Sequence, residues 1–194
     1  MNFLHDDLIR KAFGRYGKLE DAAASFLSEN FRVQEFDAKE YLVEAGTISK
    51  YFYLVVSGVQ VIYLINKKGE KVVLGFSFDG SVSGVYDSFL KQDPSKYFIE
   101  ALTPSKLIGL SYEKYCELFE KFPQLYQWRA LFMEEFSIGR SSRELEILTL
   151  TAKERFDAFV KRCPQQLLQI PQKYLASYLN MKPETFSRLR ALRD

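Results

Sequence analysis

The residues of this chain best suited to recognition chemistry lie close to its C-terminal end, in the basic segment Pro183 to Arg190. Arg188 can donate two hydrogen bonds to the edge of a guanine base, and Glu184 can accept one from the amino group of cytosine. The hydroxyl groups of Thr185 and Ser187 can bond to any base edge. We therefore expect a DNA-reading surface at this end of the chain, which also includes Lys173, Lys182 and Arg190.

Two short helices are predicted to position these side chains. Leu175 and Leu179 are one helical turn apart, and Phe186 and Leu189 repeat the spacing further on, so each helix has one apolar face. Ala176 lies on the inner side, where a small side chain lets the second helix cross closely. The segment is therefore predicted to be a helix-turn-helix.

The turn between the two helices also has suitable residues. Asn180 tolerates the left-handed backbone conformation better than most residues. Pro183 fits the first turn of a helix, where its missing amide hydrogen costs nothing. The second helix, which would carry the base-reading side chains, is therefore predicted to begin near Pro183.

Charge favours DNA binding over a second interpretation, in which the helices belong to an ordinary bundle. Residues 151–194 hold nine Lys or Arg against four Asp or Glu, whereas the whole chain has a net charge of only +2. The first 150 residues are therefore net negative by three. A basic end on a slightly acidic body is typical of a phosphate-binding module joined to a different domain, although solvated basic helices are also common.

Composition excludes several classes of protein. Hydrophobic residues make up 47% of the 194-residue chain and aromatic residues 15%, which is ample for packed cores. The absence of an 18-residue apolar run and of a signal-peptide pattern predicts a cytoplasmic protein without a membrane span. Cys116, Cys163 and the single histidine, His5, do not form a metal-ligand or catalytic pattern. We therefore expect no metal, no cofactor and no enzymatic activity.

The rest of the chain changes character along its length. Residues 1–30 contain apolar residues at helical spacing, which predicts one or two helices. Between Phe31 and Ser111 the chain is rich in aromatic and β-branched residues and is broken by turn residues at hairpin intervals. The expected strands are Tyr51–Val56, Val59–Ile65, Lys71–Phe78 and Lys96–Leu102. This pattern predicts a barrel or jelly roll within an α+β fold.

A long helix is predicted from Pro123 to about Leu148, and a shorter one from Ala152 to Arg162. The long helix has an aromatic stripe that either packs against its own domain or pairs with the same helix of a second chain. We favour pairing into a homodimer. The expected interface residues are Trp128, Phe132, Phe136 and Gly139, the last marking a close approach or a bend.

This order of parts resembles the cAMP receptor protein/FNR (Crp/Fnr) family of bacterial transcription regulators, and most closely the branch common in Bacteroidetes. The resemblance is carried by the segments Ile170–Leu179 and Pro183–Arg188. It implies a cyclic-nucleotide-binding-like sensor domain over residues 1–122, a dimerisation helix over 123–149 and a helix-turn-helix DNA-binding domain over 150–194. Many members continue into a C-terminal wing, and we expect this domain to lack one because the sequence ends at Asp194. The resemblance also implies that two copies of the chain bind a palindromic site in promoter DNA, with Glu184, Ser187 and Arg188 contacting bases.

The family's ligand cassette is altered in this chain. Cyclic-nucleotide-binding members have a Glu for the ribose and an Arg for the phosphate, and these positions correspond here to Val85 and Ser95. No Arg occurs between Arg32 and Arg129. We therefore expect no cAMP binding of the usual kind, and either an effector that the sequence does not identify or a filled barrel. The expected pocket residues are Val85, Tyr86, Ser95, Lys96 and Tyr97. The alternative function is a sensor or interaction module whose helix-turn-helix does not read DNA.

Overall fold

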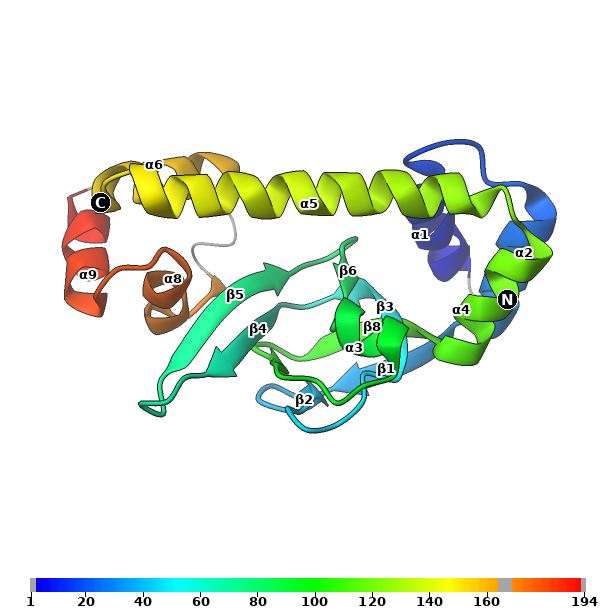
Figure 1. The fold of residues 1–194 in the computed structure, drawn as a ribbon, viewed down its shortest axis with the longest axis horizontal. Helices are drawn as coiled ribbons and strands as arrows, with labels where there is room; N and C mark the ends of the chain where they lie inside the picture. The colour runs from blue at the N-terminus through cyan, green and yellow to red at the C-terminus, as the bar shows by residue number, and fades with distance from the viewer. Residues whose placement is uncertain (1–2, 164–168, 193–194) are drawn as a thin grey trace. The chain divides into compact units, whose positions relative to one another are not determined.

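The computed structural model describes residues 3–163 and 169–192. It contains antiparallel β-sheets, a long helix and a group of C-terminal helices, which confirms the predicted α+β fold with a jelly roll (Figure 1). Contacts divide the chain into two compact units, Met1–Ile62 with Phe76–Glu134 and Tyr63–Gly75 with Glu135–Asp194. The long helix and one β-hairpin contribute residues to both units.

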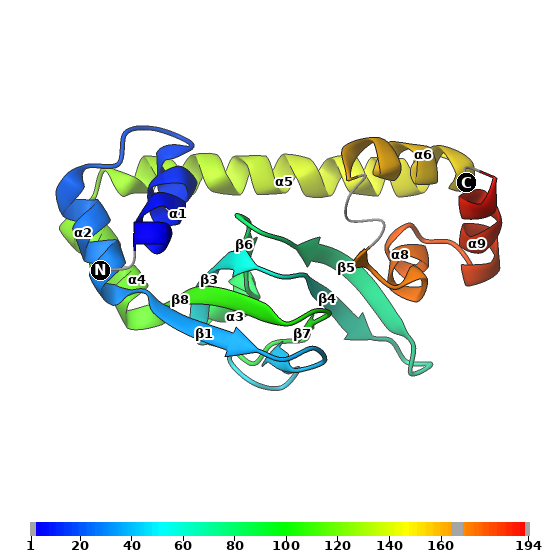
Figure 2. The same ribbon diagram turned by 180° about the vertical axis from the view of Figure 1, so that it is seen from behind.

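The jelly roll consists of two four-stranded sheets, with the orders β1-β8-β3-β6 and β2-β7-β4-β5. Figure 2 shows β1 beside β8, with which it pairs in antiparallel register. The far ends of β4 and β5 belong to the second unit. The strands are β1 Arg32–Phe36, β2 Tyr41–Val43, β3 Tyr51–Ser57, β4 Gln60–Ile65, β5 Lys71–Ser77, β6 Val82–Ser83, β7 Phe98–Ala101 and β8 Ser105–Ser111.

Alternating residues of β3 and β8 pack into two different hydrophobic cores. Phe52 and Leu54 belong to the main core together with residues of five helices, whereas Tyr53 and Val55 form a smaller cluster with Leu107. This alternation follows from the two-residue period of a strand. The helices of this main core are α1 Phe3–Gly14, α2 Asp21–Asn30, α4 Tyr112–Lys121 and the start of α5 Leu125–Thr149; α3 Tyr86–Lys91 adds Phe89.

The structure confirms the two N-terminal helices, the long helix and the four predicted strands, with bounds that differ by a few residues. The sequence interpretation missed α3 and α4. For α4 the signal was present, because Ser111 caps its first turn and Tyr115, Leu118 and Phe119 are buried at helical spacing.

The second unit contains the tip of the β4–β5 hairpin, the C-terminal part of α5 and the helices α6 Ala152–Arg162, α8 Gln172–Tyr178 and α9 Pro183–Ala191. α6 has the predicted bounds. It begins with a capping box in which Thr151 and Glu154 satisfy each other's backbone amides. Across the described ranges, no helix combines the length and apolar character needed to cross a bilayer. Those ranges also contain no group of three or more His, Cys, Asp or Glu placed to hold a metal ion.

Candidate DNA-binding surface

Helices α8 and α9 are held together by a small apolar core. Leu175 and Ala176 of α8 and Phe186 of α9 are each 0% exposed. The ring of Phe186 lies edge-on to Phe156 of α6, with 5.4 Å between the ring centroids. The small side chain of Ala176 therefore lies in the core, as the helix-turn-helix interpretation predicted.

The turn that joins the two helices ends α8 with a Schellman motif. The amide of Met181 donates to the carbonyl of Ala176 (3.0 Å), and the amide of Asn180 donates to that of Ser177 (3.1 Å). Asn180 adopts the left-handed conformation with φ of 50°. Pro183 then occupies the first turn of α9, which confirms the predicted start of that helix.

Two arginines that the sequence interpretation missed secure this turn. Arg155 of α6 donates hydrogen bonds to the carbonyl oxygens of Leu179 (2.8 Å), Asn180 (3.1 Å) and Leu150. Arg143 of α5 donates to the carbonyl of Tyr178 at 2.8 Å. Positive charge at the C-terminal end of α8 also suits the negative end of the helix dipole.

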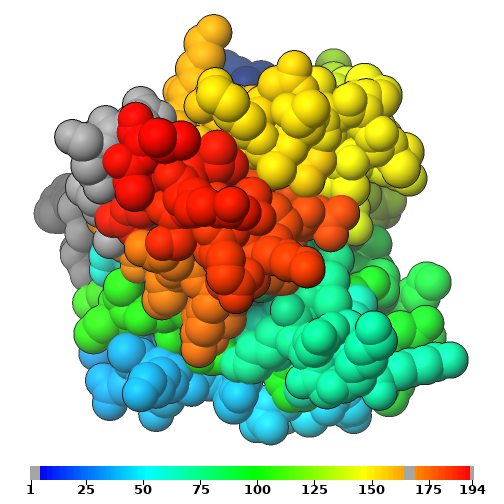
Figure 3. Space-filling view, turned by 90° about the vertical axis from the view of Figure 1, so that its left-hand side faces the viewer, coloured from blue at the N-terminus to red at the C-terminus, as the bar shows by residue number. Residues whose placement is uncertain are grey.

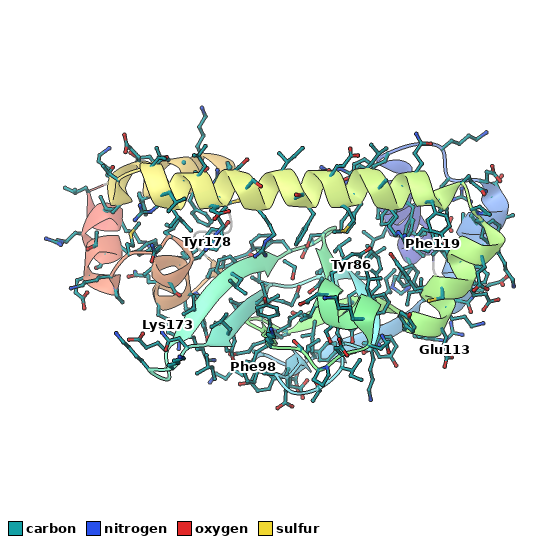
Figure 4. The ribbon with its side chains drawn as sticks, in the orientation of Figure 1. Tyr86, Phe98, Glu113, Phe119, Lys173 and Tyr178 are labelled. Carbon is teal, nitrogen blue, oxygen red and sulfur yellow. The ribbon has the colours of Figure 1, made fainter. Side chains whose placement is uncertain are left out.

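Arg143 is partly buried at this position. Its guanidinium carbon lies 4.5 Å from the centre of the Tyr178 ring, which is labelled in Figure 4. Burial lowers the pKa of Arg143, because desolvation disfavours the charged form. The sequence carried no signal for either arginine, since most of their carbonyl partners lie far away along the chain.

The predicted base-reading residues lie on the surface around this turn. Glu184, Ser187 and Arg188 are exposed and are spaced so that they share one face of α9, opposite the buried Phe186. Lys173 and Lys182 are also exposed, whereas Thr185 and Arg190 are half-buried. Figure 3 shows α9, in red, open on this face of the second unit. Their exposure is compatible with DNA binding, and their role in it remains a prediction.

The predicted ligand-pocket residues lie in the first unit. Val85 is only 2% exposed and packs with Val43 and Ile99. Ser95 is 4% exposed, and its hydroxyl donates to the carbonyl of Tyr97 (2.8 Å) and accepts from the Tyr97 amide (2.9 Å). The two expected cassette positions therefore hold an apolar side chain and a hydroxyl that is bonded within its own turn.

The other predicted pocket residues differ in their surroundings. Lys96 is exposed, whereas Tyr86 and Tyr97 are half-buried. The hydroxyl of Tyr86, labelled in Figure 4, lies 2.9 Å from that of Tyr115. A separate hollow of about 370 Å³ in the first unit is lined by Leu90, Tyr112, Tyr115, Cys116, Phe119, Glu120, Tyr126 and Arg129. The predicted pocket residues do not line this hollow.

The aromatic residues of α5 divide between the chain's own core and its surface. Trp128 is 4% exposed, and it stacks on Phe13 with 4.4 Å between the ring centroids and on Phe132 with 5.3 Å between them. Packing against the same chain therefore accounts for this part of the stripe. Phe136 is 46% exposed, and a Cβ atom at Gly139 would have no neighbour within 4 Å.

A second apolar stripe on α5, which the sequence interpretation did not separate from the first, is exposed. Ile138, Leu145 and Leu148 are 67%, 61% and 75% exposed. Leu131, Ile138 and Leu145 follow one another at intervals of seven residues, and Leu148 is three residues further. This is the spacing of a and d positions in a coiled coil.

Comparison with known proteins gives a family match within the first part of the chain. Residues 33–122 match the family model of the cyclic nucleotide-binding domain. This domain covers the jelly roll from β1 to the end of α4. No curated protein sequence matches the chain significantly.

Solved structures extend the similarity over most of the chain. FixK2 from Bradyrhizobium japonicum has a TM-score of 0.75 at 16% identity, with 84% of this chain and 83% of that chain covered. CLP from Xanthomonas campestris, described as a c-di-GMP responsive global regulator, has a TM-score of 0.72 at 15% identity, with 90% and 92% covered. The catabolite activator protein of Thermus thermophilus has a TM-score of 0.56 at 20% identity, with 90% and 83% covered.

A further similar structure, from Eubacterium rectale, is described as belonging to the Crp/Fnr family and has a TM-score of 0.71 at 16% identity, with 90% and 84% covered. At such low identities the likeness establishes the fold, which combines a domain of the cyclic nucleotide-binding type with a long helix and C-terminal helices. What the chain binds has to be argued from its own residues.

Proposed function

We propose that this chain is a DNA-binding transcription regulator of the Crp/Fnr type, which reads double-stranded promoter DNA with α9. The strongest support is that α9 has one side buried in the core and the opposite side exposed. Phe186 is fully buried and anchors the helix, whereas Glu184, Ser187 and Arg188 are exposed together on the other side. Side chains of these types match the hydrogen-bonding groups of base edges in the major groove. The regulator has no catalytic role in this proposal, and its likeness to the Bacteroidetes branch stays a prediction from the α9 sequence.

The regulator acts as a homodimer in this proposal, with α5 pairing against α5 of a second copy. The pairing face is the exposed stripe of Ile138, Leu145 and Leu148, which the half-buried Leu131 continues at the same spacing, with Phe136 and Gly139 beside it. Trp128 and Phe132 support α5 from within the same chain. Two-fold symmetry would place two copies of α9 in successive major grooves, roughly 34 Å apart, and so would require a palindromic site.

Regulation does not use the usual recognition of cAMP in this proposal. The buried Val85 and the internally bonded Ser95 offer neither a carboxylate for a ribose nor a guanidinium for a cyclic phosphate. Lys96 could supply a point charge but not a bidentate fork. An effector of the jelly roll, where one exists, would have to bind with different affinity to two states of the regulator.

The test is a selection of bound sequences from random duplex DNA, with purified full-length protein. We expect an enriched inverted repeat. On that duplex, Arg188→Ala should cost about 1 to 3 kcal/mol in binding and relax the preference at one position of each half-site.

A matched control separates base reading from charge. Lys161→Ala removes the same charge from an exposed position on α6, and it should leave the sequence preference intact. Recovery of no enriched sequence, or equal preference in the Arg188→Ala protein and the wild type, would refute the proposal. The alternative of a sensor or interaction module that does not read DNA would then be favoured.

A further inference from the structure

The tip of the β4–β5 hairpin is a rigid turn that presents two lysines. The amide of Gly69 donates to the carbonyl of Asn66 (3.0 Å), and Gly69 has a φ of 78°. The side-chain oxygen of Asn66 accepts from the amides of Lys68 (2.9 Å) and Glu70 (3.0 Å). Lys67 and Lys68 occupy the two central positions of this turn, and both are exposed. The turn is therefore organised in advance of any binding.

The same hairpin is bonded to the first helix of the helix-turn-helix. The hydroxyl of Ser177 donates to the carbonyl of Lys71 (3.0 Å) and accepts from the amide of Val73 (3.0 Å). Arg143 donates to the carbonyls of both Val73 (3.3 Å) and Tyr178 (2.8 Å). Because β5 is the last strand of its sheet, these side chains satisfy backbone groups that a neighbouring strand would otherwise pair.

Positive charge runs from the hairpin onto α8. The ammonium groups of Lys71 and Lys173 lie 5.7 and 4.9 Å from the centre of the Tyr174 ring. Figure 4 labels Lys173 on α8, and Figure 3 shows the hairpin, in turquoise, next to α8, in orange. Lys67 and Lys68 continue the strip to the tip. Glu70 is the only acidic residue of the segment 66–71, and it accepts a hydrogen bond from the Asn66 side chain (2.8 Å).

We infer that this basic hairpin is a second DNA contact, in which Lys67 and Lys68 bind backbone phosphates beside the groove that α9 reads. The inference rests on the proposed function and extends it, because it names phosphate-binding residues outside the helix-turn-helix. Lysine is suited to this role, since its ammonium group neutralises phosphate without reading sequence.

The salt dependence of binding tests this contact, because each neutralised phosphate of duplex DNA releases counterions. Each contact contributes about 0.9 to the negative slope of log K against log salt concentration, or roughly eight-fold in affinity between 1 M and 0.1 M salt. Fluorescence anisotropy with a labelled duplex, at several salt concentrations, measures the slope. The Lys67→Ala/Lys68→Ala protein should lose about 0.9 to 1.8 of slope and roughly eight-fold to sixty-fold of affinity at 0.1 M salt. The loss should be the same for a selected and a scrambled duplex.

A matched control removes the same charge elsewhere. Lys11 and Lys18 are exposed residues of the first unit, so Lys11→Ala/Lys18→Ala should keep the wild-type slope. Ser177→Ala keeps every lysine but removes two of the hydrogen bonds that hold the hairpin, and it should lose part of the slope. Thermal unfolding checks that each variant is folded.

The possible outcomes separate this inference from the proposed function. An unchanged slope in the double lysine variant, with wild-type protein that selects an inverted repeat, would overturn the hairpin contact and leave the regulator proposal standing. An equal fall in the control variant would also overturn it, since the effect would then be one of net charge. Failure of the wild type to bind any duplex would overturn both.

Discussion

Replacing Arg155 by methionine tests whether one side chain holds the helix-turn-helix in shape. Arg155 makes two partly buried hydrogen bonds, to the carbonyls of Leu179 and Leu150, and an exposed one to that of Asn180. The partly buried bonds contribute about 1 to 1.5 kcal/mol each, and the exposed one little, because water replaces it. The attraction between the Arg155 guanidinium and the negative end of the α8 dipole adds about 0.5 kcal/mol of stability. We therefore expect Arg155→Met to lower the free energy of unfolding of the second unit by about 3 kcal/mol.

Urea unfolding followed by circular dichroism at 222 nm measures this loss. With an m value of about 2 kcal/mol per molar, the midpoint should fall by roughly 1.5 M. Trp128, the single tryptophan, lies in the first unit, so its fluorescence reports whether the loss is confined to the second. Lys153→Met is the matched control, since Lys153 lies on the same helix in an exposed ion pair with Asp157, and the midpoint of this variant should stay close to that of the wild type. Equal midpoints for the two variants would refute the reasoning.

Two further substitutions address the dimer and the turn. Leu145→Glu/Leu148→Glu places charge on the exposed stripe of α5 and should yield monomers in sedimentation equilibrium, whereas Val33→Glu, at an exposed site on β1, should not. If the double variant still forms dimers, the dimer interface must lie outside this stripe of α5. Asn180→Gly should leave thermal stability nearly unchanged, whereas Asn180→Val should cost about 1 to 2 kcal/mol, because a β-branched residue resists the positive φ of this position. Equal melting temperatures for these two variants would contradict the assigned turn conformation.

The sequence predicted best the elements whose signals are local. The capping box of Thr151 and Glu154 fixed the start of α6, and Pro183 fixed the start of α9. In both cases the deciding interaction lies within one helical turn of the residue that signals it. The bounds of these helices therefore did not depend on the packing of the rest of the chain.

Features that depend on distant partners could not be predicted in the same way. Periodicity showed that Trp128 lies on an apolar face of α5, but it could not show that Phe13 covers that face. Likewise, nothing near Arg155 indicates that it binds carbonyl groups 24 and 25 residues away. The hydroxyl of Ser177 pairs with a strand more than 100 residues earlier. Such contacts follow from the tertiary fold.

On α9, the residues that stabilise the helix differ from those proposed to contact bases. This separation explains how the preferred DNA sequence could change without loss of the fold. Phe186 anchors α9 in the core and Arg155 secures the turn before it, whereas Glu184 and Arg188 are exposed to solvent. Substitution of an exposed residue without structural partners usually changes stability by no more than about 0.5 kcal/mol. Base preference could therefore change through these exposed positions while the fold stays intact. The Arg188→Ala protein should accordingly unfold at the wild-type urea concentration even where it has lost selectivity, so that the loss is one of recognition.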